Sequence, residues 1–434
     1  MRSRLVAFGA LALVVASLLF GGVAPAGAQE PDETVEVLRG NLNDTKDTRE
    51  RDDDEPVEGV SIFVRSAAGE DIDSAESDAD GRWEIEVPDP GSYEVEIDPG
   101  SLPDGVTLRN EERTTLTVSV NPGQSKTVIF ALGADTRQVA SGLEDVLQKV
   151  VLGINFGLII AMMAIGLSLI FGTTGLVNFA HAEMVTFGAL IAWFFNQTLN
   201  IQIIPAAILA MLVGGVAGGA FDLGVWRPLR RRKTGLIAMM VASIGLSLLI
   251  RYVFLYFFAG RTRPYSDYFA QTAVDIGPIS VPPRDLWSIA ISLTVLIIVG
   301  VLLQATRVGK AMRAVADNPD LAASSGIDVD RVILFVWAAG GALAALGGVL
   351  LGLGEQVSWE MGFKQLLLIF AGVTLGGLGT AYGALVGSFI IGVAVQVSTV
   401  WVPPELNAVT ALVVLIGILL VRPQGILGQA ERIG

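Results

Sequence analysis

Long apolar runs constrain this chain more than any other feature of its sequence. About 20 apolar residues cross the hydrocarbon core of a bilayer, and several of the runs reach that length. Hydrophobic residues make up 52% of the chain, which has a mean hydropathy of +0.59. The sequence therefore predicts a polytopic α-helical membrane protein with about nine transmembrane helices. The expected spans lie near 149–171, 180–196, 202–225, 235–259, 286–305, 331–354, 364–380, 381–402 and 406–421.

The section before these runs is rich in charged residues, which favours contact with water over contact with lipid. Residues 29–137 hold 28 acidic and 10 basic residues, a net charge of −18, whereas the whole chain has −14. At the start, Arg2 and Arg4 precede an apolar run that ends before Ala26-Gly27-Ala28. This pattern predicts a secretory signal peptide over 1–28, with an uncleaved anchor helix as the alternative. In both cases residues 29–137 are expected to be extracytoplasmic.

Short alternating runs predict an all-β domain in this front section. Residues 29–56 are acidic and are interpreted as a flexible segment, and 133–148 as a linker. Between them, turn pairs such as Asp80-Gly81 separate short alternating runs, which favours a β-sandwich over 57–132. It resembles the carboxypeptidase-regulatory-like modules. Asp78-Ala79-Asp80-Gly81 is interpreted as a hairpin turn, because it lacks the later ligands of a calcium loop. The expected strands are 60–64, 83–87, 93–97, 116–120 and 127–132.

Basic residues indicate how the membrane part is oriented. They cluster over 227–233 and 307–331, and again after the last span at Arg422. Cytoplasmic loops carry an excess of Lys and Arg. With residues 29–137 outside, about nine crossings place all three basic regions inside. The expected location is the plasma (inner) membrane, crossed several times.

A polar break at 171–183 is the first candidate functional segment. It contains the only histidine of the chain, and polar groups at membrane depth commonly mark solute or ion pathways. Non-helical backbone is tolerated there when it lines a cavity or is buried in protein. The alternative is a polar turn at the cytoplasmic surface. The candidate pathway or gate residues are Thr173, Thr174, Asn178, His181 and Glu183.

A second candidate segment lies at 309–327. Its pattern predicts a helix, an Asp-Asn-Pro turn and a short helix that ends at Gly326. Asp317 or Asn318 can cap the helix that begins at Pro319. A short helix at the inner face of a membrane protein suits docking of a cytoplasmic partner, and an ordinary polar loop is the alternative.

Glycine spacing predicts close helix packing. Gly379, Gly383 and Gly387 recur every four residues, which gives a groove for a neighbouring helix. A pore-lining role for 376–379 is the alternative. Arg251 lies inside an apolar span and is expected to snorkel towards an interface. The chain has no cysteine and one histidine, so neither a thiolate site nor a multi-histidine metal site is expected.

Three motifs resemble the branched-chain amino acid ABC transporter permeases of the LivH type. They are Asn178-Phe179-Ala180-His181 after Phe171-Gly172-Thr173-Thr174-Gly175, then the run 309–316 with Gly326-Ile327, and last Arg422-Pro423-Gln424-Gly425-Ile426-Leu427-Gly428. They occur in the order of the family and together cover 149–428. Ala182 stands where members of the family commonly carry glycine. The front section 29–137 lies outside the resemblance.

The resemblance implies a permease that is not an enzyme and has no catalytic residue, metal or cofactor of its own. The implied partners are a second permease subunit, two cytoplasmic ATPases that bind ATP and Mg, an extracytoplasmic substrate-binding protein and membrane lipid, with no nucleic acid. This chain has no G-x-x-x-x-G-K-[ST] motif of its own. By analogy with the family, 309–327 is the ATPase coupling loop, with Gly309, Arg313, Asp317, Asn318 and Gly326 as its candidate residues.

Two other functions stay open. Related permeases carry urea and short amides, so these solutes are an alternative substrate class. An ion-coupled secondary transporter is the other alternative, and it would need carboxylates inside the membrane. A membrane-anchored adhesion or sensor protein needs one anchor helix, and about nine spans argue against it.

Overall fold

The computed structural model places two separate units. The described residues are 36–44, 55–66, 69–89, 91–103, 105–108, 114–120, 126–128, 130, 132–133, 142–258, 260, 262–268, 271, 273–277 and 279–428. The expected signal peptide at 1–28 lies outside them. One unit falls within Val23–Ala140 and the other includes Ser141–Gly434, and each is described by itself.

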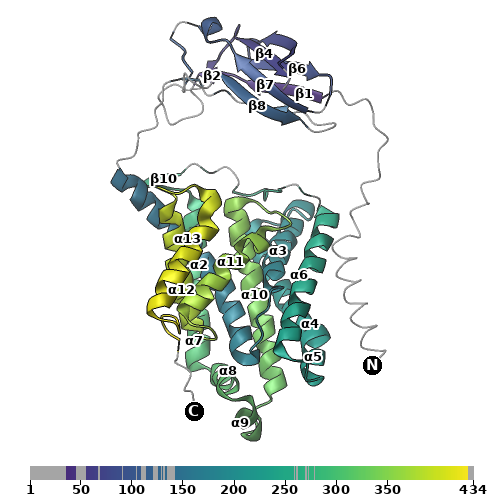
Figure 1. The fold of residues 1–434 in the computed structure, drawn as a ribbon, viewed down its shortest axis with the longest axis vertical. Helices are drawn as coiled ribbons and strands as arrows, with labels where there is room; N and C mark the ends of the chain where they lie inside the picture. The colour runs from purple at the N-terminus through teal and green to yellow at the C-terminus, as the bar shows by residue number, and fades with distance from the viewer. Residues whose placement is uncertain are drawn as a thin grey trace. The chain divides into compact units, whose positions relative to one another are not determined.

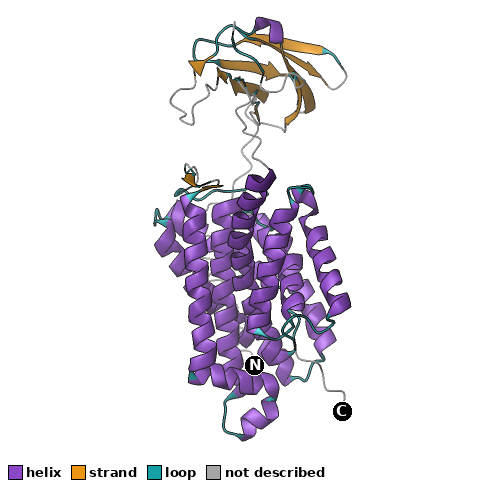
Figure 2. Cartoon of the chain, turned by 90° about the vertical axis from the view of Figure 1, so that its left-hand side faces the viewer, coloured by secondary structure: helices purple, strands orange, loops and turns teal. Residues whose placement is uncertain are grey.

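The first unit is built from β-strands (Figures 1 and 2). One sheet has the order β6-β1-β9 and another the order β5-β4-β7-β8, with a short β2-β3 pair beside them. All pairings are antiparallel except that of β1 with β9. The strands are β1 (Glu36–Asn41), β2 (Asn43–Asp44), β3 (Glu55–Pro56), β4 (Ser61–Ser66), β5 (Asp71–Glu76), β6 (Arg82–Val87), β7 (Gly91–Ile97), β8 (Thr115–Val120) and β9 (Lys126–Thr127).

Both larger sheets contribute to one apolar core. Leu38 of β1 and Ile85 of β6 lie in the same buried cluster as Ile62 of β4 and Val95 of β7. Along β6 the burial alternates strictly, so apolar side chains point inward and Glu84 and Glu86 point to solvent. Each of the five expected strand runs overlaps an observed strand. The Asp78–Gly81 turn is also confirmed, since Gly81 N–H donates to the Asp78 carbonyl at 2.8 Å.

The β unit begins earlier in the chain than its composition suggests. β1 lies inside 29–56, which was interpreted as a flexible acidic segment, yet it pairs along its whole length with β6. Leu38 is fully buried there. A high local charge hid the alternation, because charged side chains can occupy every outward position of a strand whose other face is buried.

The second unit is a bundle of helices, and every expected apolar run forms one. Among the described residues, six helices are long and apolar enough to cross a membrane, and the others are shorter. The chain is thus a polytopic helical membrane protein. The helices over the expected spans are α2 (Gly142–Thr174), α3 (His181–Trp193), α4 (Ile203–Phe221), α6 (Leu236–Phe258), α7 (Pro283–Ala305), α10 (Val329–Glu355), α11 (Met361–Gly376), α12 (Ala381–Ser398) and α13 (Asn407–Val421).

The remaining elements mark the two ends of the bundle (Figure 1). At one end lie α5 (Arg227–Arg231), α8 (Arg307–Asp317) and α9 (Pro319–Ser324), and we call it the basic end. At the opposite end a hairpin joins β10 (Val274–Ile276) to β11 (Ile279–Val281). The side chain of Gln148, near the start of α2, exchanges two hydrogen bonds with the backbone of Ser280, so α2 starts at the hairpin end.

Glycine allows the central helices to touch along their backbones. α10 packs against α2, α3 and α4. At Gly340 an added Cβ would lie 3.1 Å from the Gly166 carbonyl oxygen of α2, and at Gly348 it would lie 2.0 Å from the Val185 carbonyl oxygen of α3. Membrane helices lack a hydrophobic driving force for association, so close packing of this kind stabilises the bundle.

The expected glycine groove is present, although Gly379 is not part of it. Gly383 and Gly387 of α12 face α11, where added Cβ atoms would lie 2.5 Å from the Gly376 carbonyl oxygen and 2.1 Å from that of Gly372. Gly379 lies in the turn before α12 with a φ of 80° and meets Gly172 of α2 instead. The expected boundary between the spans 364–380 and 381–402 agrees with the start of α12 at Ala381, whereas the four-residue spacing wrongly grouped Gly379 with the glycines of that helix.

We expect Gly387→Ala to destabilise the bundle by about 1–3 kcal/mol, because the methyl group has no space beside Gly372. The measurement is the thermal midpoint of the purified full chain in detergent. Gly245→Ala on α6 is the matched control, since no described atom of a neighbouring element lies within 4 Å of the Cβ it would add. Equal midpoints for the two variants would contradict the packing described here.

Candidate functional site

The chain reverses direction after α2 and returns into the bundle. Gly175 makes the turn with a φ of 69°, a left-handed conformation that favours glycine, and its N–H donates to the Phe171 carbonyl at 2.7 Å. Residues 175–180 then carry the chain to the first residue of α3, His181. We call 175–180 the re-entrant segment.

The re-entrant segment climbs well away from the end of α2. His181 Nε2 lies 2.8 Å from the carbonyl oxygen of Met163, which precedes Thr174 by eleven residues. At 1.5 Å per residue, that contact is about 16 Å from the end of α2. The expected alternative, a turn at the cytoplasmic surface, therefore does not describe this segment.

The polar side chains of this region are buried inside the bundle. Asn178 and His181 have no exposed surface, and Glu183 is 1% exposed. Asn178 Oδ1 accepts the Ala180 N–H at 3.1 Å and so shapes the entry to α3. Phe179 packs on Phe370 of α11, with 5.1 Å between ring centroids. The segment is thus enclosed by protein, which is where irregular backbone is tolerated at membrane depth.

Several of these buried groups use only part of their hydrogen-bonding capacity. The Met163 carbonyl can only accept, so His181 donates through Nε2, and its Nδ1 has no partner among the described residues. Glu183 Oε1 accepts from Ser247 Oγ at 2.8 Å, while no described residue pairs with Oε2. Asn178 Nδ2 is also without a partner in the described part of the chain. Buried polar groups are normally paired, so three such atoms close together in the sequence mark a candidate functional site.

Two of the expected pathway residues close the end of α2 instead. Thr173 Oγ1 donates to the Leu169 carbonyl at 3.0 Å, and Thr174 Oγ1 donates to that of Ile170 at 2.6 Å. These bonds satisfy carbonyls in the last turns of the helix. Thr173 and Thr174 therefore lie next to the cluster of Asn178, His181 and Glu183, but their hydroxyl groups are hydrogen-bonded.

One face of α6 follows the re-entrant segment. Ser243 Oγ accepts the Phe179 N–H at 3.1 Å, and Ser247, one turn further on, reaches Glu183. Arg251 lies one more turn along, 9% exposed, with its guanidinium 3.8 Å from the ring centroid of Phe363. The expected snorkelling of Arg251 stays a prediction, and its contact with the ring of Phe363 depends on the position of α11.

The expected helix–turn–helix at 309–327 is present at the basic end. Thr306 caps α8 by accepting the Gly309 N–H at 3.1 Å, and Asn318 caps α9 by accepting from Asp320 and Leu321, each at 3.0 Å. Gly326 ends the pair with a φ of 84°. We call residues 307–326 the α8–α9 loop.

The candidate coupling residues divide into two groups. Gly309 is buried, and its Cβ would lie 2.2 Å from the Leu303 carbonyl oxygen, so it permits α8 to fold back on α7. Arg313 donates to the same carbonyl and completes the end of α7. Asp317, Asn318 and Gly326 are exposed. Leu321, which the sequence did not single out, exposes 65% of its surface on α9.

The α8–α9 loop continues almost directly into the central helix α10. Asp328 caps α10 by accepting the Arg331 N–H at 3.1 Å. Asp330 accepts hydrogen bonds from two arginines of α5, from Arg227 Nε at 3.0 Å and from Arg231 at 2.9 Å. These contacts join the loop, α5 and the start of α10 into one connected structure at the basic end.

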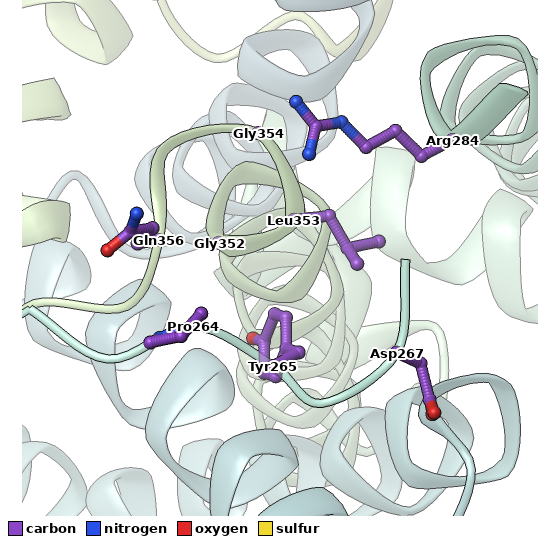
Figure 3. Close-up of a pocket in the computed structure, with 8 residues that line it drawn as sticks. All are labelled: Pro264, Tyr265, Asp267, Arg284, Gly352, Leu353, Gly354 and Gln356. Atoms are coloured by element: carbon purple, nitrogen blue, oxygen red, sulfur yellow. The ribbon is translucent and has the colours of Figure 1, made fainter. Parts of the chain in front are cut away.

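A pocket of about 230 Å³ lies at the other end of the bundle, between the 264–267 stretch and the end of α10 (Figure 3). Tyr265 is buried beside it and donates to the Ala189 carbonyl of α3 at 3.3 Å, and burial raises the pKa of its phenol. Asp267 accepts the Asn196 side-chain N–H at 3.0 Å and the Ile203 backbone N–H at 2.8 Å. The stretch therefore covers the end of α3. The pocket is lined by Pro264, Tyr265, Asp267, Arg284, Gly352, Leu353, Gly354 and Gln356.

A bundle of membrane-crossing helices, with a polar re-entrant segment inside it and a capped helix pair at its basic end, defines a transport permease. The family model described as the branched-chain amino acid transport system / permease component matches residues 150–419. The chain belongs to this family. It is accordingly a multi-pass membrane permease of the inner membrane and not an enzyme, and ATP hydrolysis in such systems occurs on separate ATPase subunits.

Individual relatives agree with this assignment. The high-affinity branched-chain amino acid transport system permease protein LivH of Salmonella typhimurium is 30% identical over 300 residues, covering 66% of this chain and 96% of the relative. The probable LivH of Methanocaldococcus jannaschii is 28% identical over 308 residues, covering 66% and 94%. The ribose import permease RbsC of Haemophilus influenzae is 25% identical over 244 residues, covering 54% and 71%.

We expect Asn318→Ala to loosen α9 by about 1 kcal/mol, since it removes the side-chain acceptor for two backbone N–H groups. Hydrogen exchange of the α9 amides should accelerate about fivefold, the equivalent of that free energy. Asn318→Asp keeps an acceptor oxygen and serves as the control. Unchanged exchange in the alanine variant would show that α9 does not depend on this cap.

Proposed function

We propose that this chain is the permease subunit of an ATP-driven importer of leucine, isoleucine, valine or similar amino acids. The observation that carries the proposal is the buried, half-partnered polar cluster at Asn178, His181 and Glu183, which lies inside the region matched by the family. Uncompensated polar groups inside a membrane protein are costly, so their retention favours a role with a solute. The names of the LivH relatives supply the substrate class.

The proposed orientation follows from charge. The basic end carries Arg227, Arg230 and Arg231 on or beside α5, and Lys310 and Arg313 on α8. Loops rich in Lys and Arg favour the cytoplasmic side, so the α8–α9 loop faces the cytoplasm. Residues 29–137 and the Tyr265 pocket are then extracytoplasmic, and the signal at 1–28 directs the β unit there.

The proposed assembly contains a second permease subunit, two cytoplasmic ATPases that carry ATP and Mg, and an extracytoplasmic substrate-binding protein. In this arrangement an ATPase docks on the exposed side of the α8–α9 loop. Asp317, Asn318, Gly326 and the exposed Leu321 form that surface. Gly309 and Arg313 hold the loop against α7 and keep it from moving independently of the bundle.

The mechanism runs through α10. When the ATPases bind ATP and close, they displace the α8–α9 loop, and the short 325–328 connection passes that displacement to α10. This helix contacts α2 at Gly166 and α3 at Val185 through glycines, so closely that no side-chain atom would fit between the backbones. Movement of α10 therefore shifts α3 and the re-entrant segment against α6, which opens the polar cluster alternately to each side.

ATP-dependent uptake of labelled leucine tests the proposed function. We expect membrane vesicles that contain this chain, its candidate partner subunits and the binding protein to accumulate leucine only with ATP, with competition by isoleucine and valine. Vesicles that lack this chain are the control.

Two outcomes would change the proposal. ATP-dependent uptake of urea or a short amide without leucine uptake would keep the importer and replace its substrate. Uptake of any of these solutes that persists without ATP would indicate an ion-coupled secondary transporter.

Alanine variants test the role of the polar cluster. We expect Asn178→Ala and His181→Ala to reduce leucine uptake by about tenfold or more, since each removes a buried hydrogen bond that holds the break in the helix. Thr294→Ala, on the exposed side of α7 and outside both candidate segments, is the control. Normal uptake by both cluster variants would remove these residues from the pathway.

The β unit is proposed to be an accessory domain. Deletion of residues 29–137 distinguishes its possible roles. Lower uptake at limiting binding protein would indicate a docking role, whereas unchanged uptake with lost cell-surface binding would indicate a separate adhesion role.

A further inference from the structure

The buried face of α6 is polar, which is unusual for a membrane helix. This 23-residue helix buries five residues, and three of them are Ser243, Ser247 and Arg251, spaced four apart. Side chains with that spacing lie on one face of a helix. Its large apolar side chains, such as Leu249 and Val241, point outward instead. A helix that turns polar groups towards its own protein commonly borders a solute pathway.

Two opposite charges meet at this face without pairing. Glu183 of α3 binds Ser247 through Oε1, and its Oε2 has no partner among the described residues. Arg251 lies one turn of α6 beyond Ser247 on the same buried face. No described residue pairs with the buried Arg251 Nε, and no ion pair within 4.0 Å joins Arg251 to Glu183 in the described part of the chain. A carboxylate and a guanidinium thus lie at the same face of α6, each with hydrogen-bonding capacity left over.

We infer that Glu183, Ser247 and Arg251 form a subsite for a zwitterionic amino acid, an inference that rests on the proposed function. Glu183 Oε2 accepts a hydrogen bond from the α-ammonium group of the solute. The Arg251 guanidinium, oriented by the ring of Phe363, donates to its α-carboxylate. Guanidinium matches a carboxylate in shape, and both charge pairs are strengthened where water is excluded. The solute completes a buried ion pair that the protein leaves open.

The arrangement selects against solutes that lack either charge. A neutral sugar or urea cannot neutralise the two buried groups, and an amine or a carboxylic acid neutralises one and leaves the other unpaired. Leaving a buried charge unpaired is strongly unfavourable. The side chain of the solute contributes little to this discrimination, so the subsite recognises the backbone of an amino acid in general.

The absence of cysteine in this chain allows a direct test. Ser247→Cys places one thiol at the subsite, and its modification by a small methanethiosulfonate is followed on this chain by mass spectrometry, in vesicles that hydrolyse ATP. We expect leucine to slow the modification about tenfold at saturation. Isoamylamine, which lacks the carboxylate, 4-methylpentanoate, which lacks the ammonium, and D-ribose should each protect far less.

Wild-type uptake in the same vesicles separates the two proposals. No ATP-dependent leucine uptake by the wild type would remove the proposed function. When the wild type shows normal uptake, three labelling results would overturn the subsite and leave the proposed function standing. They are no modification of Ser247→Cys during turnover, no protection by leucine, and protection by the amine or the acid as strong as that by leucine.

Charge variants provide a second, independent test. We expect Arg251→Gln and Glu183→Gln each to lower the number of leucine molecules transported per ATP hydrolysed by about tenfold or more. Each variant loses one buried charged contact with the solute. Arg263→Gln is the matched control, since Arg263 also lies over a ring, that of Trp193, with 4.7 Å to the centroid. Equal transport stoichiometry in all three variants would overturn the subsite.

Discussion

The contact between His181 and the Met163 carbonyl is the interaction on which the transport region depends. It holds the first residue of α3 against the middle of α2, about 16 Å from the point where α2 ends. The chain must therefore cross that depth as a non-helical segment with few internal backbone bonds. Such a segment survives inside a membrane protein only when neighbours satisfy or enclose its polar groups. Asn178, Ser243 and the rings of Phe179 and Phe370 do so here.

Enclosure of this segment in turn depends on the glycines of α10 and α2. Gly340 and Gly166 let the two helices meet at their backbones, and an added Cβ at Gly166 would lie 3.2 Å from His181 Cε1. A larger residue at either position would push α2 away from the histidine that it holds. Close packing and the polar cluster are consequently one structural feature, and the motion of α10 that we propose would reach the cluster directly through Gly166.

The two ends of the bundle are built for different tasks. At the basic end, capped helices and the Asp330–arginine contacts brace the loop that we propose as the ATPase docking surface. At the opposite end, the 264–267 stretch covers α3 through the Tyr265 and Asp267 hydrogen bonds. The polar face of α6 lies between them, and within the described part of the chain Glu183 and Arg251 form no ion pair, as the proposed solute subsite requires.

The sequence by itself determined the class of this protein and the order of its parts. Apolar runs predict membrane helices because the bilayer demands about 20 such residues, and short motifs such as Asn178–His181 and Gly309–Ala316 identify the family. The Asn318 cap and the Gly383–Gly387 groove also follow from local chemistry. Tertiary structure alone decided that 175–180 climbs into the bundle, that Arg251 meets Phe363, that Gly379 lies outside its expected helix and that β1 belongs to a sheet. Each of these depends on which distant segment lies alongside, and sequence spacing carries no record of that.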